Sequence, residues 1–243
     1  MNIHFVKLSP TQNITLLIPD PVPREEQGAI AARLMAWDGV AAEQVGYIEQ
    51  PALPGADARL QMMGGEFCGN AAMSLGALLA AREGLMDKES RTYNLEVSGT
   101  EGLTECTILR LNNSYLGRVR MPLPYSIDRV QLDTGHGMIE PYAVAIPGIT
   151  HVMLTADYSL TENEALHCIS GWCDALHADA LGILFTNTTR STIKPLVYVP
   201  ETGSLCWERG CGSGTAAFGC WMALQAGTGY TGLVHQPGGD IQV

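Results

Sequence analysis

The sequence contains no apolar run long enough to cross a membrane. Its longest apolar run, residues 71–81, is broken by Ser74 and Gly76, whereas a membrane-spanning helix needs about 20 apolar residues. We expect this run to form a buried core helix. Residues 1–5 have neither a basic segment nor an apolar signal core, which favours a cytoplasmic protein.

Runs of basic residues and low-complexity segments are also missing. The net charge is −11 and the lysines and arginines are dispersed, whereas binding to a phosphate backbone needs them clustered. A nucleic-acid partner is therefore not expected, and the acidic balance indicates mainly that the chain is soluble. No motif for a separate cofactor is found, so we expect the protein to use none.

Seven cysteines are present, which is an odd number. In a chain of 243 residues without a secretory signal, this count disfavours a disulfide framework and favours thiols in a reducing compartment. Most buried cysteines act as small hydrophobic residues. We assign this structural role to Cys106, Cys168, Cys173, Cys206 and Cys220.

The two remaining cysteines belong to an internal repeat, formed by residues 66–80 and 209–223. When Cys68 is superposed on Cys211, the glycine after each cysteine, a glycine eight positions on and an alanine twelve positions on all coincide. Small residues at this spacing form one slim stripe along a helix. Each copy therefore predicts a turn that carries cysteine, followed by a tightly packed helix.

The segments around the repeat predict a duplicated α+β architecture. Surface helices are predicted at 23–37, with proline near its start, and from a capping box at 161–164 to about His177. Alternating or apolar runs predict strands at 4–18 with a kink at Pro10, 93–97, 106–111, 118–121, 142–146, 151–154, 182–186, 196–199 and close to residue 243.

The turn-rich segment that begins at Met121 is the expected junction between two halves. We expect an N-terminal half at 1–120, joined by the last strand at 236–243, and a C-terminal half at 121–235. Each half would then hold one cysteine-bearing helix.

A cysteine at the start of a helix has surroundings suited to acid–base chemistry. It lies at the positive end of the helix dipole, among N–H groups without helical partners, which lowers the pKa of a thiol below about 8.5. The same N–H groups can bind a carboxylate, which the neighbouring glycine allows to approach closely. Racemisation removes the α-proton from one face of a substrate and returns a proton to the other. Two chemically similar thiols in facing halves therefore predict an amino-acid racemase or epimerase.

These motifs resemble the diaminopimelate epimerase family over most of the chain. The first catalytic turn of the family is similar to residues 66–70, and the second is similar to residues 208–214. Its opening strand, its Gly-Asn-Pro-His segment and its closing strand resemble residues 5–18, 147–152 and 237–241. The resemblance implies two pseudo-symmetric halves, each with a curved, mostly antiparallel sheet wrapped around a central helix.

The resemblance also implies roles for individual residues. Cys68 and Cys211 would be the acid–base pair. The residues implied to bind the substrate are Asn13, Gly69, Asn70, Glu208, Arg209, Gly212 and Ser213. Those that could assist are Glu66, His151 and Asn187. Alternatively, Glu208 and Arg209 are solvated surface charges and His151 is a satisfied core histidine.

One departure from the family concerns the substrate. The asparagine of the Gly-Asn-Pro-His segment is replaced here by Ile149, which cannot hydrogen-bond a second carboxylate. We therefore expect diaminopimelate to be a poor substrate. The pattern looks closer to the histidine racemases of opine-metallophore pathways, so we expect histidine as substrate. We expect the protein to bind a small amino acid and not to bind a membrane. A homodimer is compatible with the sequence.

Other functions stay open. A proline or hydroxyproline racemase also uses two cysteines, although its first motif normally has histidine where Asn70 stands. A phenazine-biosynthesis type of isomerase would use a glutamate such as Glu66. Two Cys-x4-Cys pairs resemble a zinc site, but Cys168 and Cys173 lie in a predicted helix, on different faces. A binding protein without catalysis, on the same fold, is the last alternative.

Overall fold

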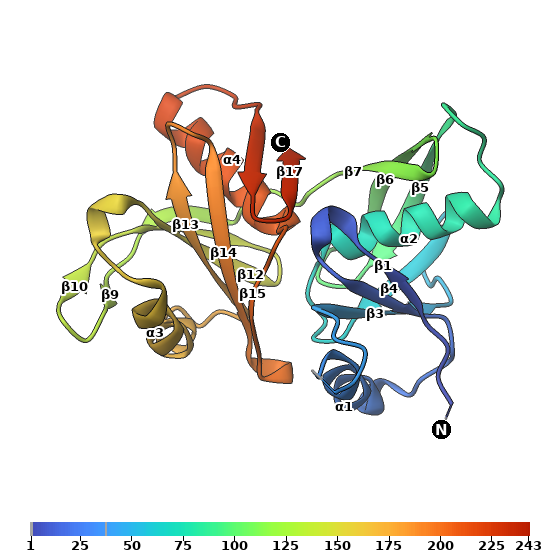
Figure 1. Ribbon diagram of the computed structural model, residues 1–243, viewed down its shortest axis with the longest axis horizontal. Coiled ribbons are helices and arrows are strands. Elements are labelled where there is room, and N and C mark those ends of the chain that lie inside the picture. The colour runs from blue at the N-terminus through green and yellow to red at the C-terminus, as the bar shows by residue number, and fades with distance from the viewer. Residues whose placement is uncertain (1, 37) are drawn as a thin grey trace. The chain divides into compact units, whose positions relative to one another are not determined.

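One order of elements occurs twice along the chain, as the repeat predicts (Figure 1). In each copy, a hairpin, a surface helix, a second hairpin, a cysteine-bearing helix and a third hairpin follow one another. The computed structural model describes residues 2–36 and 38–243, and the chain divides into two units between Met121 and Pro122. That boundary lies one residue from the expected junction.

The first unit is a sheet with the strand order β1-β2-β3-β4-β5-β6-β7. Its neighbouring strands are antiparallel except at β2–β3 and β4–β5, where helices α1 (Arg24–Met35) and α2 (Gly69–Arg82) make the crossovers. The kink expected at Pro10 is a short 3₁₀ turn (Pro10–Gln12). The strands are β1 (Val6–Leu8), β2 (Thr15–Ile18), β3 (Gln44–Glu49), β4 (Ala58–Met62), β5 (Ser90–Val97), β6 (Leu103–Leu111) and β7 (Ser114–Val119).

The second unit repeats this plan in the order β17-β16-β14-β13-β12-β11-β8, with β15 beside β14. Helices α3 (Glu162–Ala175) and α4 (Gly212–Ala226) make its parallel crossovers, and the capping box at Thr161 and Glu164 is confirmed. The strands are β8 (Ser126–Arg129), β11 (Tyr142–Ile146), β12 (Ile149–Leu154), β13 (Leu181–Asn187), β14 (Thr192–Val199), β15 (Ser204–Trp207), β16 (Leu233–Gln236) and β17 (Gly239–Gln242), with β9 (Leu132–Asp133) and β10 (Met138–Ile139) as a separate small pair.

The closing strand differs from the expectation. β17 pairs with β16 inside the second unit, so the expectation that residues 236–243 join the N-terminal half is wrong. The turn between the two strands is too short to carry the chain elsewhere, because Gln236 and Gly239 already face each other in the ladder.

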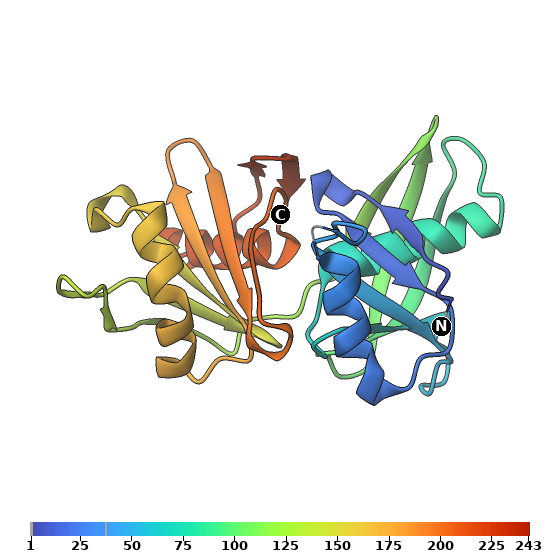
Figure 2. The same cartoon turned by 60° about the horizontal axis from the view of Figure 1, so that its bottom comes forward.

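Each sheet is covered by a helix on both faces (Figure 2). Successive residues of a strand point to opposite faces, and in β13 Ile183 packs with the α3 cluster while Leu184 packs with the α4 cluster. In β2, Leu17 likewise packs with the α2 cluster and Leu16 with that of α1. Helix α2 contacts every strand from β2 to β7, so the sheet curves around it as expected.

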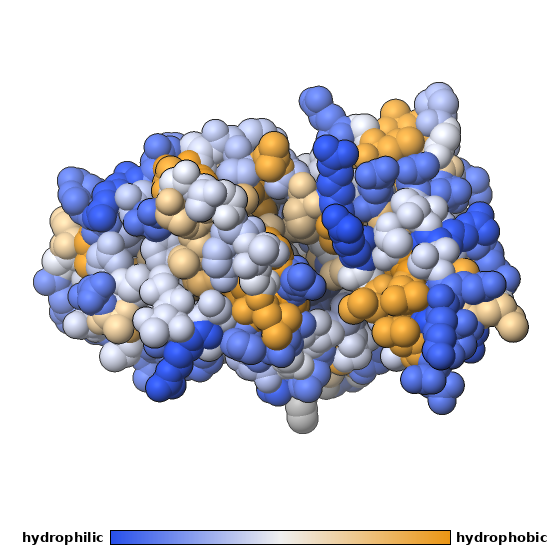
Figure 3. All heavy atoms as spheres, turned by 90° about the horizontal axis from the view of Figure 1, so that it is seen from above, coloured by the Kyte–Doolittle hydropathy of each residue, from blue (hydrophilic) through white to orange (hydrophobic). Residues whose placement is uncertain are grey.

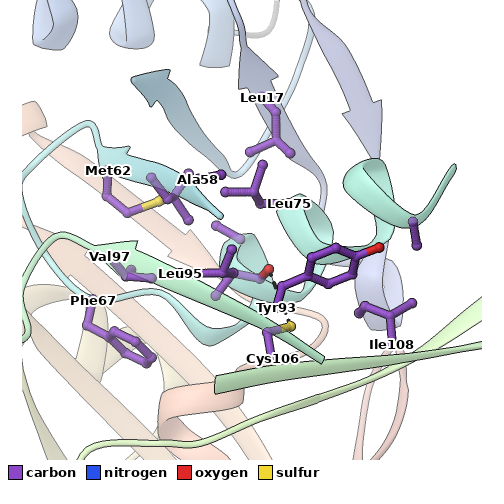
Figure 4. Packing of buried hydrophobic residues seen from close by; sticks show 14 residues of the cluster. Leu17, Ala58, Met62, Phe67, Leu75, Tyr93, Leu95, Val97, Cys106 and Ile108 are labelled. Carbon is purple, nitrogen blue, oxygen red and sulfur yellow. Dashed lines mark hydrogen bonds between the residues drawn. The ribbon is translucent and has the colours of Figure 1, made fainter. Parts of the chain in front are cut away.

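Glycines in the small-residue stripes of α2 and α4 allow these helices to approach their sheets closely. At Gly76 of α2, a β-carbon would lie 2.9 Å from the sulfur of Cys106 and 3.0 Å from Ile108, both on β6. At Gly219 of α4, it would lie 2.8 Å from Val243. Figure 4 shows how Leu95, Cys106 and other apolar side chains of the strands surround α2. The cysteine-bearing helices are therefore held firmly against their sheets.

The surface shows no single dominant apolar area in the view from above: hydrophilic residues cover most of that face and hydrophobic ones form separate groups (Figure 3). Within residues 2–36 and 38–243, no helix has the length and apolar character needed to cross a membrane.

Candidate active site

Both repeated cysteines are the N-cap residues of their helices, as expected. Cys68 has φ −131° and ψ 110°, and Cys211 has φ −118° and ψ 109°. Each sulfur accepts the backbone N–H three residues on, from Ala71 at 3.4 Å and from Gly214 at 3.3 Å. The thiols thus fill the place that serine or aspartate usually takes, and the backbone geometry of the two sites is nearly the same.

The amides next to each cysteine are suited to an anion. Helix geometry gives the N–H groups of the first turn no acceptor within the helix, and the sulfur accepts the third of them. The first two amides belong to Gly69 and Asn70 in one unit and to Gly212 and Ser213 in the other. Each pair, beside its own thiol, is suited to bind a carboxylate and to stabilise negative charge that develops on it.

The Cys68 thiol has a partner that the sequence did not indicate. Its S–H donates to Oε1 of Gln44 at 2.8 Å, and Gln44 is the first residue of β3. Strand β3 was not predicted, so a glutamine directed at the site could not be recognised. The signal that could have found it is the apolar run 45–48, which Gln44 directly precedes.

Cys211 is only 3% exposed and has polar neighbours on several sides. Its sulfur lies 3.4 Å from Oγ of Ser213, which in turn lies 3.0 Å from Nε2 of His151. The Cys211 thiol also donates a hydrogen bond to the Glu208 carboxylate. The backbone N–H of Cys211 donates to Oε1 of Gln236 at 2.7 Å, which fixes the start of the turn.

The pKa of Cys211 lies well above its ordinary value. Burial is the largest cause, followed by the negative charge of Glu208 and the hydrogen bond to it. The hydrogen bonds from Ser213 and from the Gly214 amide act in the opposite direction but are outweighed. The expectation that a helix N-terminus lowers this pKa is therefore wrong for Cys211, since desolvation of the thiolate dominates. Cys211 is therefore a protonated thiol near neutral pH.

His151 is buried, as a core histidine would be, yet its side chain reaches the site. It is fully shielded from solvent, and burial lowers its pKa to about 3. The ring is therefore neutral near pH 7. Its Nδ1 has no hydrogen-bond partner among the described residues, whereas Nε2 meets Ser213. An N–H on Nε2, donated to Ser213, leaves the Ser213 hydroxyl proton for the sulfur of Cys211.

The remaining expected residues are engaged in various ways. Asn13 is buried, with Oδ1 accepting from Gln44, and Glu66 is partly buried, with Oε2 accepting the Gly64 N–H at 2.9 Å. Burial raises the pKa of Glu66. The guanidinium of Arg209 donates to the carbonyl of Pro237 at 3.1 Å, and the exposed Asn187 accepts the Arg190 N–H at 3.0 Å. Their proposed contacts with substrate stay predictions.

Comparison with known proteins shows to which family the chain belongs. The family model described as the histidine racemase CntK N-terminal domain matches residues 2–243. The chain belongs to this family. A histidine racemase of Staphylococcus aureus strain Mu50 is 32% identical over 247 residues, covering 99% of this chain and 88% of the relative. Another from Fusobacterium nucleatum subsp. nucleatum is 30% identical over 229 residues, covering 90% of this chain and 80% of the relative.

Solved structures of racemases and epimerases share the fold. A probable proline racemase from Agrobacterium radiobacter K84, with bound carbonate, has a TM-score of 0.72 at 16% identity, covering 99% of this chain and 84% of that one. A hydroxyproline epimerase from Agrobacterium vitis has a TM-score of 0.72 at 12% identity, covering 99% and 82%. Such low identity shows the α+β fold alone.

Membership of the family makes the chain an amino-acid racemase, and hence an isomerase, as the paired motifs predict. The zinc alternative gains no support. Cys168 and Cys173 both lie on α3, and among the described residues no group of three or more His, Cys, Asp or Glu side chains is placed to hold a metal ion.

Proposed function

We propose that this protein interconverts the two enantiomers of histidine without a cofactor, using Cys68 and Cys211 as its acid and base. The observation that carries the proposal is the pair of thiols in matching N-cap positions, one in each repeated unit. Racemisation needs one such group on each face of the α-carbon. The proposal requires both sulfurs to reach the same bound substrate.

The chemistry follows from the groups around each thiol. The substrate carboxylate would bind the first two amides of α2 and α4, which also stabilise the charge that builds up when the α-proton leaves. In one direction, the Cys211 proton passes to Glu208, the thiolate takes the α-proton, and Cys68 gives its proton to the opposite face. The hydroxyl of Ser213 and the amide of Gly214 hold the Cys211 thiolate meanwhile.

Histidine is favoured as substrate for two reasons. The relatives that match nearly the whole chain are named histidine racemases. In addition, Ile149 stands where the diaminopimelate epimerases have an asparagine, and it is buried against the apolar cluster of α4. A second carboxylate would have no partner there. A place in opine-metallophore synthesis, a cytoplasmic location and a homodimer remain predictions.

Deuterium exchange tests this proposal. Purified protein is incubated with L-histidine, proline or diaminopimelate in deuterated water, and the products are separated by chiral chromatography. We expect D-histidine with deuterium at the α-carbon, and more than 100-fold slower turnover in Cys68→Ser and in Cys211→Ser, because serine is a far weaker base at neutral pH. Cys168→Ser, on the outer helix α3, is the matched control and should keep full activity.

Two results would overturn the proposal. Exchange on diaminopimelate or proline but not on histidine would exclude the substrate. Full racemisation by either serine variant would exclude the mechanism. The closeness of the thiols is tested separately: air oxidation without reductant should inactivate the enzyme and join residues 68 and 211, seen as one linked peptide in mass spectrometry.

A further inference from the structure

The carboxamide of Gln44 is held by two buried partners. Its Nε2 donates to Oδ1 of Asn13 and, at 2.7 Å, to Oγ1 of Thr15. The Thr15 hydroxyl donates its own proton to the Asn13 carbonyl at 3.4 Å, so it receives the Gln44 N–H with a lone pair. Asn13 and Thr15 are both 0% exposed, and Gln44 is 6% exposed. The nitrogen of the carboxamide is thereby turned away from the cysteine.

The oxygen of Gln44 must then face the sulfur of Cys68. The 2.8 Å contact joins this oxygen to the sulfur, and an amide oxygen can only accept a hydrogen bond. A thiol satisfies it by donating S–H. A thiolate would face the negative end of the carbonyl dipole and would be disfavoured.

We propose that Gln44 is a positioning residue that holds Cys68 as a protonated thiol in the resting enzyme. The inference rests on the proposed function, because it assigns Cys68 as the proton donor and Cys211 as the base. It goes further in predicting that the two thiols, both protonated in the resting enzyme and alike in backbone geometry, are held in that state by different groups.

The repeated architecture shows where this difference arises. In the first unit, the strand pair β2–β3 places Thr15 opposite Gln44, and Gln44 contacts the cysteine directly. In the second unit, the corresponding pair β12–β13 places His151 opposite Gly182, and His151 contacts Ser213 instead. Both sulfurs accept a backbone N–H of their own helix. In addition, Cys68 meets an uncharged acceptor, whereas Cys211 meets a hydroxyl donor and a carboxylate.

With Cys68 as the proton donor and Cys211 as the base, the enzyme holds the same number of protons before and after one turnover. The resting enzyme holds one proton on each thiol and none on Glu208. After a turnover that begins with Cys211 as base, Cys211 and Glu208 are protonated and Cys68 is a thiolate. The number of protons on the enzyme is unchanged, and a transfer from Glu208 through solvent to Cys68 restores the resting form. Gln44 favours that return because it stabilises the thiol.

Two carboxylate side chains lie close in sequence to Gln44 and Cys68. Glu43 directly precedes Gln44, and Glu66 precedes Cys68 by two residues, with its Oε2 on the Gly64 amide. When charged, either one would oppose a thiolate at Cys68, in the same direction as Gln44. Both are unchanged in a Gln44 variant, so a comparison with the wild type isolates the carboxamide.

The test is the rate at which iodoacetamide alkylates each cysteine between pH 6 and 10, followed by peptide mass spectrometry without substrate. In Gln44→Met, which keeps the length of the side chain but removes the acceptor, we expect Cys68 to react about tenfold faster at pH 7, equivalent to a fall of one pKa unit. Thr15→Val removes one of the two groups that hold the carboxamide and should give a smaller increase. Cys211 in the same samples is the internal reference and should not change.

An unchanged or slower reaction of Cys68 in folded Gln44→Met protein would overturn the inference. A slower reaction would mean that the carboxamide nitrogen, not its oxygen, faces the sulfur. If Gln44→Met fails to fold, Thr15→Val provides the test instead. Faster alkylation of Cys68 supports the inference, and unchanged or slower alkylation overturns it. Because alkylation needs no turnover, its outcome is separate from the failure of histidine racemisation in deuterated water.

Discussion

The imidazole of His151 lies directly against the backbone of Gly182. The two residues face each other across β12 and β13, and a β-carbon at Gly182 would overlap Nδ1 and lie 2.6 Å from Cε1 of the ring. The absence of a side chain at position 182 is what lets the ring stand within the sheet and reach Ser213. Nothing in the local sequence around Gly182 indicates this role.

Gly182→Ala should therefore displace His151 and, through Ser213, disturb Cys211. We expect a loss of about 1–3 kcal/mol in the free energy of unfolding, the usual cost of overpacking a filled core, and a fall in kcat. Urea denaturation and racemisation assays measure the two effects. The matched control is Gly171→Ala on α3, where a β-carbon meets nothing within 4 Å. It should keep its activity and gain about 0.5–1 kcal/mol of stability. Equal behaviour of the two variants would contradict the packing argument.

Two neighbours of Cys211 should shift its pKa in opposite directions. Glu208→Gln removes a charge that raises this pKa, so alkylation of Cys211 at neutral pH should become faster. Ser213→Ala removes a hydrogen bond that lowers it, so alkylation should become slower. Both variants should racemise more slowly, since one loses the proton acceptor and the other loses a donor to the thiolate. If both variants changed the alkylation rate of Cys211 in the same direction, the proposed contacts of Glu208 and Ser213 with its sulfur would be refuted.

His151 should make the protein sensitive to acid. Its pKa is about 3 in the folded chain against 6.5 in the unfolded one, so below pH 6.5 the unfolded chain binds the extra proton. The stability that neutral His151 provides is present above pH 6.5 and is lost as the pH falls towards 3, by about 1.4 kcal/mol per pH unit. Urea denaturation between pH 3.5 and 7 measures this slope.

His151→Gln should flatten that slope, whatever it does to stability at neutral pH. His136→Gln, at a histidine whose side chain is 79% exposed, is the control and should leave the slope as in the wild type. A slope unchanged by His151→Gln would mean that the buried histidine is not the group that takes up the proton.

The repeat made much of the fold predictable. The match of residues 66–80 with 209–223 predicted two halves with a small-residue helix in each, and both helices begin directly after their cysteines. The capping box at Thr161 predicted the start of α3 for a purely local reason. Strands β3 and β4 were missed because their residues are buried on both faces and do not alternate.

The site was predictable only where one short segment carries the signal. The two cysteines and their following amides form such segments, so their place at the helix starts followed from the sequence. The partners of the thiols come from distant strands: Gln44 lies 24 residues from Cys68, and His151 lies 62 residues from Ser213. Burial, which decides the pKa of Cys211, also depends on the whole unit, and a helix-terminus argument therefore gave the wrong sign.

The capping role of the thiols has a consequence for how the enzyme tolerates insertions and deletions. In each unit the atom expected to move protons is also the atom that marks where the helix starts. If the chain before a cysteine lengthens or shortens, the helix start and its amides travel with the sulfur. The distance between each sulfur and the amides expected to bind the carboxylate is thus set by local hydrogen bonding and not by the length of the chain before the cysteine.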